Sequence, residues 1–319
     1  MAVKVAEYLG HNAEVPGATI APVGDTQLCP FTNGDPCKKL ANDRKPPVCS
    51  VRKTARGHAG TLWITCSKRL CASQHNISLS AYQSDMLFAI AKILFGSGVS
   101  KSDVLIKSEE QIAFLEAEAK PYRADFTMQL KPPAESSIKG KSKFIVEMQG
   151  GGETSNTGKL TAQIEKWFDA PSRANADLTE PVKDVGTLET NAWRRQQEQL
   201  LVKGSSAKAT GECGMALCVG EALFDYIIKK IGKTRLYSFS NNPPQVAWSL
   251  AIIPIIEARD TDSEGISVGD SLALKPDREK ALYMDYDNFV NLLVAQGGDS
   301  NMAFKGNCLD LNGTQVQMH

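Results

Sequence analysis

The sequence has 319 residues, of which 42% are hydrophobic and 23% are charged. These proportions are those of globular proteins and exclude a largely disordered or fibrous chain. Lysine plus arginine and aspartate plus glutamate each number 36, so the formal net charge is zero and no global basic excess indicates a nucleic-acid partner. No stretch reaches the roughly 18 apolar residues of a membrane helix, and the first residues lack a signal-peptide core. We therefore expect a cytoplasmic protein with no membrane contact.

The first part of the chain, residues 1–78, is rich in proline and glycine and has one clear strand pattern, Gly60–Cys66, where β-branched and aromatic residues run together. Apolar residues at helical spacing then predict a helix from Leu79 to Leu94. The same reasoning predicts a second helix over Ser108–Ala119, with its apolar residues on one face.

Two strands are predicted next, Ala124–Leu130 and Lys143–Gln149, and the second ends at the glycine run Gly150–Gly152. The remaining expected elements are helices over residues 157–169, Ala192–Lys203 and Tyr286–Ala295, an apolar strand and helix over Cys213–Ile228, and strands over Arg235–Ser240 and Gln245–Glu257. This order predicts an α/β fold. We expect an N-terminal region of residues 1–78 and a larger domain of residues 79–319.

Five of the eight cysteines fall between Cys29 and Cys71. A reducing cytoplasm does not favour disulfides, whereas four thiolates satisfy a tetrahedral Zn²⁺ or a rubredoxin-like iron. Such a metal would contribute folding free energy to a region with little apolar periodicity. Four cysteine ligands leave no open coordination position, so a structural role is expected. The alternative is a set of unrelated buried or free thiols.

Acidic side chains gather on the two predicted strands. Asp125 lies near the start of the first, and Glu147 and Gln149 project from the same face of the second. If the strands pair as a hairpin, Asp125 comes beside Glu147, and hard cations such as Mg²⁺ prefer carboxylate oxygens. The alternative is a solvent-facing Glu and Gln. Phe144–Val146 argues against it, because that run predicts an inner strand, where an unpaired carboxylate is costly. The glycines at 150–152 would allow a bulky ligand backbone to approach closely.

The arrangement Glu110, Asp125, Glu147-Met-Gln149 resembles the PD-(D/E)XK nuclease fold in its E-x-Q variant. Together with the cysteine pattern CPFTNGDPC…PPVCSVRK…LWITCSKRL, it resembles NotI-type type II restriction endonucleases over roughly residues 20–256. The resemblance implies a central mixed sheet flanked by helices, with an N-terminal loop-rich four-cysteine metal knot.

The same resemblance implies a homodimeric, Mg²⁺-dependent enzyme of the bacterial cytoplasm. It would cut both strands of double-stranded DNA within a GC-rich palindrome such as CGGCCG and leave 5′-phosphate and 3′-hydroxyl ends. A cognate DNA methyltransferase would protect the host's own sites, with no direct contact implied. The metal of the knot would be iron, although the cysteines themselves suit zinc equally.

Carried over by position, the resemblance makes Asp125 and Glu147 the Mg²⁺ ligands and puts Gln149 where the family usually has lysine. Glu110 would be the acid of the preceding helix, with Glu109 as its competitor.

The knot ligands would be the four-cysteine cluster of Cys29, Cys37, Cys49 and Cys66. The stretch ITCSKRL, residues 64–70, looks like the family's ICPxRL with Ser67 where proline is usual. This departure leaves the choice between Cys66 and Cys71 open.

Recognition of bases requires side chains such as arginine for guanine and amides for other base edges. The densest supply lies on the helix predicted around residues 192–203, and the candidates are Asn191, Arg194, Arg195, Gln196 and Gln197. Lys159, Lys166 and Arg173 could contact phosphates. The alternative is a solvated helix face. Two competing functions remain, a non-specific or repair nuclease on the same fold and a non-catalytic DNA-binding protein with a structural metal.

Overall fold

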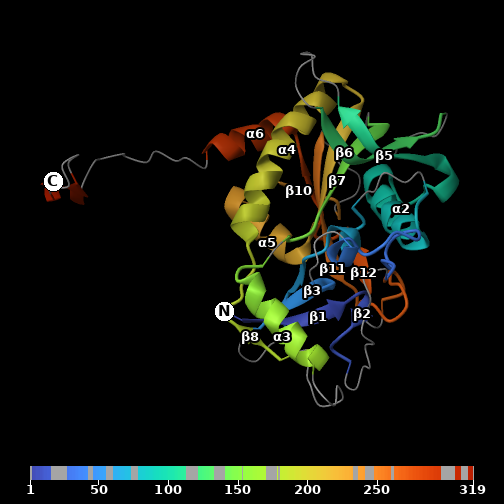
Figure 1. Cartoon of the computed structure of the whole chain (residues 1–319). Coiled ribbons are helices and arrows are strands. Elements are labelled where there is room, and N and C mark those ends of the chain that lie inside the picture. The colour runs from blue at the N-terminus through green and yellow to red at the C-terminus, as the bar shows by residue number, and fades with distance from the viewer. Residues whose placement is uncertain are drawn as a thin grey trace.

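The computed structural model describes residues 2–15, 27–41, 46–54, 60–72, 78–112, 121–132, 141–152, 154–169, 178, 180–232, 236–240, 248–259, 262–295, 306–309 and 315–318. Within these residues the protein is mixed α/β, with a mixed sheet flanked by helices and a second, smaller sheet (Figure 1). None of the helices in this part of the chain combines the length and the apolar character needed to cross a membrane.

The larger sheet has eight strands in the order β10-β13-β11-β9-β7-β6-β5, with β12 beside β11. Its strands are β5 (Val104–Ile112), β6 (Tyr122–Leu130), β7 (Lys143–Gln149), β9 (Cys213–Gly220), β10 (Tyr237–Ser238), β11 (Leu250–Glu257), β12 (Leu274–Pro276) and β13 (Leu282–Met284). Strands β5, β6 and β7 form an antiparallel meander, and β7, β9 and β11 run parallel. The apolar runs of β9 and β11 are typical of parallel strands covered on both faces.

The helices are α1 (Lys38–Ala41), α2 (Ala81–Phe95), α3 (Thr157–Asp169), α4 (Glu189–Ala209), α5 (Glu221–Ile231) and α6 (Tyr286–Ala295), with 3-10 turns η1 (Ser67–Leu70) and η2 (Lys101–Asp103). Helices α2 and α4 lie on opposite sides of the large sheet (Figure 1). Phe144 of β7 packs edge-on against Phe95 of α2, whereas Glu147, on the other face of β7, pairs with Lys203 of α4. Strand β7 therefore presents an apolar face to one helix and a polar face to the other.

Most elements predicted beyond residue 78 are confirmed, among them α2, α3, α6, β6 and β7. The helix predicted over Ser108–Ala119 is wrong: residues 108–112 belong to β5, and residues 113–119 lie outside the described part. Eight of the nine residues of β5 pair with β6, and this cross-strand pairing overrides the local apolar spacing that suggested a helix.

The N-terminal region is more ordered than its composition suggests. It forms a five-stranded antiparallel sheet from β1 (Ala2–Tyr8), β2 (His11–Asn12), β3 (Val48–Lys53), β4 (Leu62–Ile64) and the later β8 (Val182–Lys183). Strand β4 confirms the predicted Gly60–Cys66 strand at its centre, but β1 and β3 were not predicted. Val5, Val51 and Trp63 are fully buried, so this region has an apolar core although its sequence shows little apolar periodicity.

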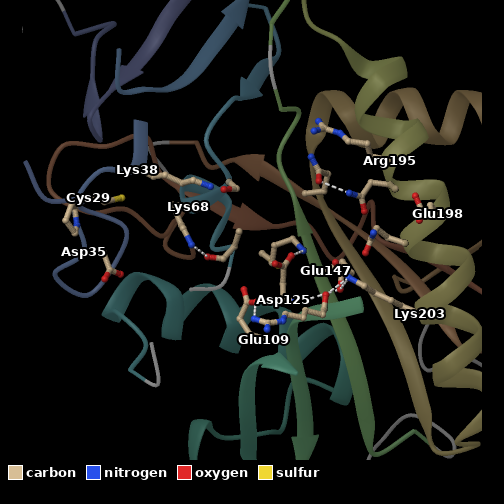
Figure 2. A pocket seen from close by; sticks show the side chains of 18 residues that line it. Cys29, Asp35, Lys38, Lys68, Glu109, Asp125, Glu147, Arg195, Glu198 and Lys203 are labelled. Carbon is tan, nitrogen blue, oxygen red and sulfur yellow. Dashed lines mark hydrogen bonds and ion pairs between the residues drawn. The ribbon is translucent and has the colours of Figure 1, made fainter. Parts of the chain in front are cut away.

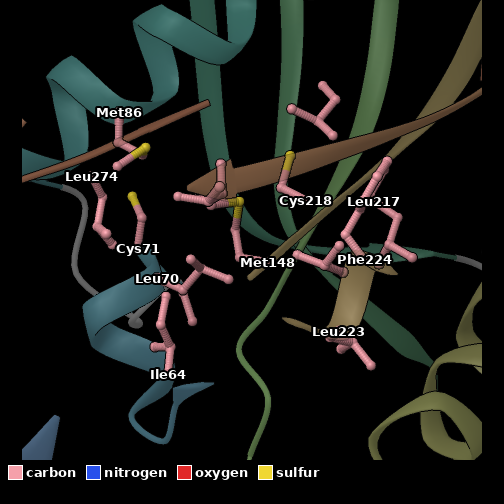
Figure 3. Close-up of a cluster of buried hydrophobic side chains, with 14 of the residues drawn as sticks. Ile64, Leu70, Cys71, Met86, Met148, Leu217, Cys218, Leu223, Phe224 and Leu274 are labelled. Carbon is pink, nitrogen blue, oxygen red and sulfur yellow. The ribbon is translucent and has the colours of Figure 1, made fainter. Parts of the chain in front are cut away.

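One continuous apolar core joins the two expected regions, because the cluster that contains Val5 and Trp63 also contains Phe144 and Phe289. Figure 3 shows part of this core, where Ile64 and Leu70 of the N-terminal region lie among Met148 and other residues of the large sheet. The short strand β8 pairs with β1 and adds a second connection between the regions.

Candidate active site

A cavity of about 960 Å³ opens where the ends of β6 and β7 meet α4 and η1 (Figure 2). Asp125 and Glu147 lie in its wall, with Lys203 and Arg195 from α4 on one side and Lys68 from η1 on the other. Residues from well-separated parts of the sequence thus meet at the ends of two inner strands of the sheet.

The carboxyl groups of Asp125 and Glu147 lie side by side, as the hairpin pairing predicted. The regular β6–β7 pairing ends at Phe126 opposite Val146. Beyond it, the Met148 N–H donates to Asp125 Oδ2 at 2.8 Å and the Asp125 N–H donates to Glu147 Oε1 at 3.4 Å. Each carboxylate therefore accepts a hydrogen bond from the backbone of the opposite strand, which fixes the pair at the point where the strands separate.

Lys203 holds Glu147 from the other side. Its Nζ donates to Glu147 Oε1 at 2.7 Å and to the Arg123 carbonyl oxygen at 2.6 Å, and its side chain is only 2% exposed. Lys203 was not among the residues predicted for the site. Lys203 lies between Leu200 and Ala207 at helical spacing. This spacing places a lysine on the apolar, buried face of α4, which is the signal that could have identified it.

Burial and the adjacent Asp125 raise the pKa of Glu147 to about 7, against the opposing effect of Lys203. Burial also raises the pKa of Asp125, against the opposing effects of the Met148 N–H and Lys203. A bound cation would stabilise the ionised forms of these two neighbouring carboxyl groups. Mg²⁺ is commonly bound through one or two carboxylates together with waters and substrate phosphates, and Asp125 and Glu147 provide this donor set.

Gln149 is held by its neighbours at the cavity wall. Gln196 Nε2 of α4 donates to Gln149 Oε1 at 2.6 Å, and Gln149 Nε2 donates to the Gly150 carbonyl at 2.5 Å. Gln196 is 6% exposed, and within the described structure its Oε1 is a buried oxygen with no hydrogen-bond partner. Gln196, one of the residues predicted to contact bases, also lines the main cavity.

The structure does not bring Glu110 to the carboxylate pair, and its assignment to a helix is wrong because it lies on β5. Glu110 lines a separate hollow of about 560 Å³ and pairs with Lys107 at 3.3 Å and Lys143 at 3.7 Å. Glu109, its competitor, lines the main cavity and lies 3.7 Å from Arg123. Glu109 has a left-handed backbone (φ 53°), which a sequence pattern does not reveal.

The other residues predicted to contact DNA lie at several places. Arg195 lines the main cavity and, with Asn191 and Arg194, a smaller hollow of about 350 Å³. Gln197 is half-buried on α4. Lys159 of α3 pairs with Asp184 at 2.9 Å and lies outside the residues that line the main cavity. Lys166 lies exposed on the same helix as Lys159, and Arg173 lies outside the described residues.

The four cysteines of the cluster lie within electrostatic reach of one another. Burial raises the pKa of Cys29 to about 11 and also raises the pKa values of Cys37 and Cys49, and in each case the nearby Cys66 thiol contributes. Backbone N–H groups, of Phe31 at Cys29 and of Lys39 and Leu40 at Cys37, oppose this rise in the pKa values. Nearby N–H groups favour the thiolate state that a structural Zn²⁺ or iron requires.

Cys71 lies apart from this cluster, fully buried in the apolar core near Cys218 (Figure 3). Its Sγ lies 3.8 Å from the Gln83 carbonyl oxygen. The geometry therefore favours Cys66 as the fourth member. Within the described residues, no group of three or more histidine, cysteine, aspartate or glutamate side chains is placed to hold a metal ion.

A single turn of chain links the cysteine cluster to the cavity. Cys66 immediately precedes η1, whose Ser67 and Lys68 line the cavity. The next residue, Arg69, is fully buried and pairs with Glu7 at 2.9 Å. Burial lowers the pKa of Lys68, and Asp125 opposes this shift, so the two side chains are within electrostatic reach of each other.

The chain matches no family model. A search of curated proteins likewise finds no match.

Proposed function

We propose that the protein is a Mg²⁺-dependent nuclease of the PD-(D/E)XK type and, more specifically, a type II restriction endonuclease. The observation that carries the proposal is the carboxylate pair of Asp125 and Glu147, fixed at the split end of β6 and β7 in the wall of a large polar cavity. The mixed sheet flanked by helices supports the proposed fold.

In this proposal Asp125 and Glu147 hold the cation, which when bound supplies positive charge to the phosphate and acidity to a water. Gln149 positions the attacking water through its amide, since it has no charge with which to act as a base. Hydrolysis consumes one water: its oxygen bonds to phosphorus, the bond from phosphorus to the 3′ oxygen breaks, and solvent receives one proton and returns one. The products carry 5′-phosphate and 3′-hydroxyl ends.

Basic side chains around the cavity support a polyanionic substrate. Lys68 approaches from η1 and Arg195 from α4 (Figure 2). Arg194, the neighbour of Arg195, is exposed on α4. In the proposal Arg194, Arg195, Asn191 and Gln197 contact double-stranded DNA, and a homodimer reads a GC-rich palindrome because twofold protein symmetry matches twofold DNA symmetry.

The remaining parts of the proposal concern stability and setting. The four-cysteine cluster would bind iron or zinc in a structural role, because four thiolates leave no open coordination position. Glu109 takes the place proposed earlier for Glu110, since it is the acid that lines the cavity with Asp125. A bacterial cytoplasm and a protecting methyltransferase complete the proposed restriction system.

The test is cleavage of a plasmid of known sequence with Mg²⁺. Discrete fragments are expected, and sequencing their ends gives the recognition site. A smear would instead indicate a non-specific or repair nuclease, and a gel shift without cutting would indicate a non-catalytic DNA-binding protein. Glu147→Ala should abolish cleavage and keep DNA binding in Ca²⁺, whereas Glu264→Ala, at an exposed residue away from the cavity, should cut normally. Retained cutting by Glu147→Ala would remove this residue from the active site.

A further inference from the structure

The buried lysine of α4 carries an inference that rests on the nuclease proposal and extends it. Lys203 is 2% exposed, and lysine is almost never fully buried unless it is paired. Its position on the helix, in step with Leu200 and Ala207, would suit an apolar residue. A charged side chain at this position therefore has a role that the packing of α4 alone does not explain.

The contacts of Lys203 direct its charge at the carboxylate pair. Nζ donates to Glu147 Oε1 at 2.7 Å and to the Arg123 carbonyl at 2.6 Å. An ammonium group has three N–H donors. Two are used by these oxygens, and the third can serve an acceptor in the cavity, which Lys203 lines together with Asp125.

Gln149 on β7 cannot supply this charge. Its amide is neutral, with the oxygen accepting one hydrogen bond from Gln196 and the nitrogen donating one to the Gly150 carbonyl. Among the described residues that line the cavity, Lys203 is the basic side chain in direct contact with Glu147.

We propose that Lys203 is a further catalytic residue, which contacts the scissile phosphate and supplies from α4 the positive charge that Gln149 does not supply from β7. As the water oxygen bonds to phosphorus and the bond to the 3′ oxygen breaks, negative charge grows on the non-bridging oxygens. Lys203 donates a hydrogen bond to one of these oxygens and keeps its own proton throughout. Preorganised donors of this kind contribute about 10²–10³ to a rate.

The experiment compares Lys203→Met and Lys203→Gln with Lys208→Met on the same helix. Lys208 is exposed and pairs with Asp287, away from the cavity. Single-turnover cleavage is measured with Mg²⁺, and Mn²⁺ affinity is measured by calorimetry without DNA at alkaline pH. Both Lys203 variants should cut about 100-fold more slowly or worse and bind Mn²⁺ about threefold more tightly or better, because a cation that repels the metal is gone. Lys208→Met should match the wild type in both.

The combination of slower cleavage and tighter metal binding separates the proposal from a structural role, which would weaken both. Cleavage equal to that of Lys208→Met, weaker Mn²⁺ binding, or loss of folding in both Lys203 variants by circular dichroism would each overturn the proposal. If the wild type itself neither cuts DNA nor binds Mn²⁺, the nuclease proposal fails. If the wild type cuts and the Lys203 variants cut equally well, only the role of Lys203 fails.

Discussion

The buried carboxyl of Glu147 should make the stability of the metal-free protein depend on pH in an unusual direction. Burial and Asp125 raise its pKa from 4.5 to about 7, so the folded protein holds this proton more tightly than the unfolded chain does. The contribution to stability is fully present below pH 4.5 and is lost as pH rises to about 7. The difference corresponds to roughly 3 kcal/mol, at about 1.4 kcal/mol per pKa unit.

The measurement is urea unfolding of the metal-free protein at several pH values, with Glu147→Gln as the matched variant because glutamine has the same shape and does not titrate. Between pH 4.5 and 7.5 the unfolding free energy of the wild type should fall by roughly 3 kcal/mol relative to that of Glu147→Gln. The comparison removes the contributions of the groups that both proteins share. Parallel curves for the two proteins would show that Glu147 titrates normally and would refute the reasoning.

Three further outcomes are expected. Mn²⁺ affinity of the wild type, measured by calorimetry, should rise about tenfold per pH unit below pH 7 and level off above it, because the metal displaces the Glu147 proton. An affinity that does not change with pH would contradict this. Cys66→Ser should lower the iron or zinc content measured by elemental analysis, whereas Cys71→Ser, in the apolar core, should retain it; equal metal contents would remove Cys66 from the cluster. Gly151→Ala should destabilise the protein by about 1–3 kcal/mol in thermal unfolding, because its Cβ would lie 2.1 Å from the β4 indole ring, while Gly158→Ala, with open space around it, should not; equal melting temperatures would contradict the packing.

Local patterns predicted those elements whose stability comes from their own sequence. Strand β7 and helices α3 and α6 have the predicted bounds because apolar residues recur at the right period between clear breaks. The apolar run Phe144–Val146 correctly predicted an inner strand with a buried Glu147 after it. The adjacent placement of Asp125 followed from the same hairpin.

The features that escaped prediction depend on partners far along the chain. Strand β1 pairs with β3, although many proline and glycine residues separate them in the sequence. Strand β5 forms because β6 lies beside it. The run Gly150–Gly152 was assigned to a ligand's approach, but a Cβ at Gly150 would lie 2.9 Å from the Ile64 carbonyl and one at Gly151 would meet Trp63. These glycines therefore admit strand β4 of the protein itself.

Two details of the site were beyond sequence reasoning for other reasons. Glu109, and not Glu110, reaches the cavity, and the left-handed backbone at residue 109 interrupts the regular alternation of side chains along β5. Lys203 reaches the site from helix α4. The polar residues of this helix predicted a function for its exposed face and not for its buried one.

The pairing of β8 with β1 has a consequence for how the molecule melts. A segment located between α3 and α4 completes the N-terminal sheet, and Trp63 donates a hydrogen bond from its indole to the Gly152 carbonyl at 3.1 Å. Unfolding of either region would break the hydrogen bonds and contacts that it makes with the other. Calorimetry should therefore record a single unfolding transition. For the same reason, residues 79–319 expressed alone should aggregate, since the surface that β4 now covers would face water.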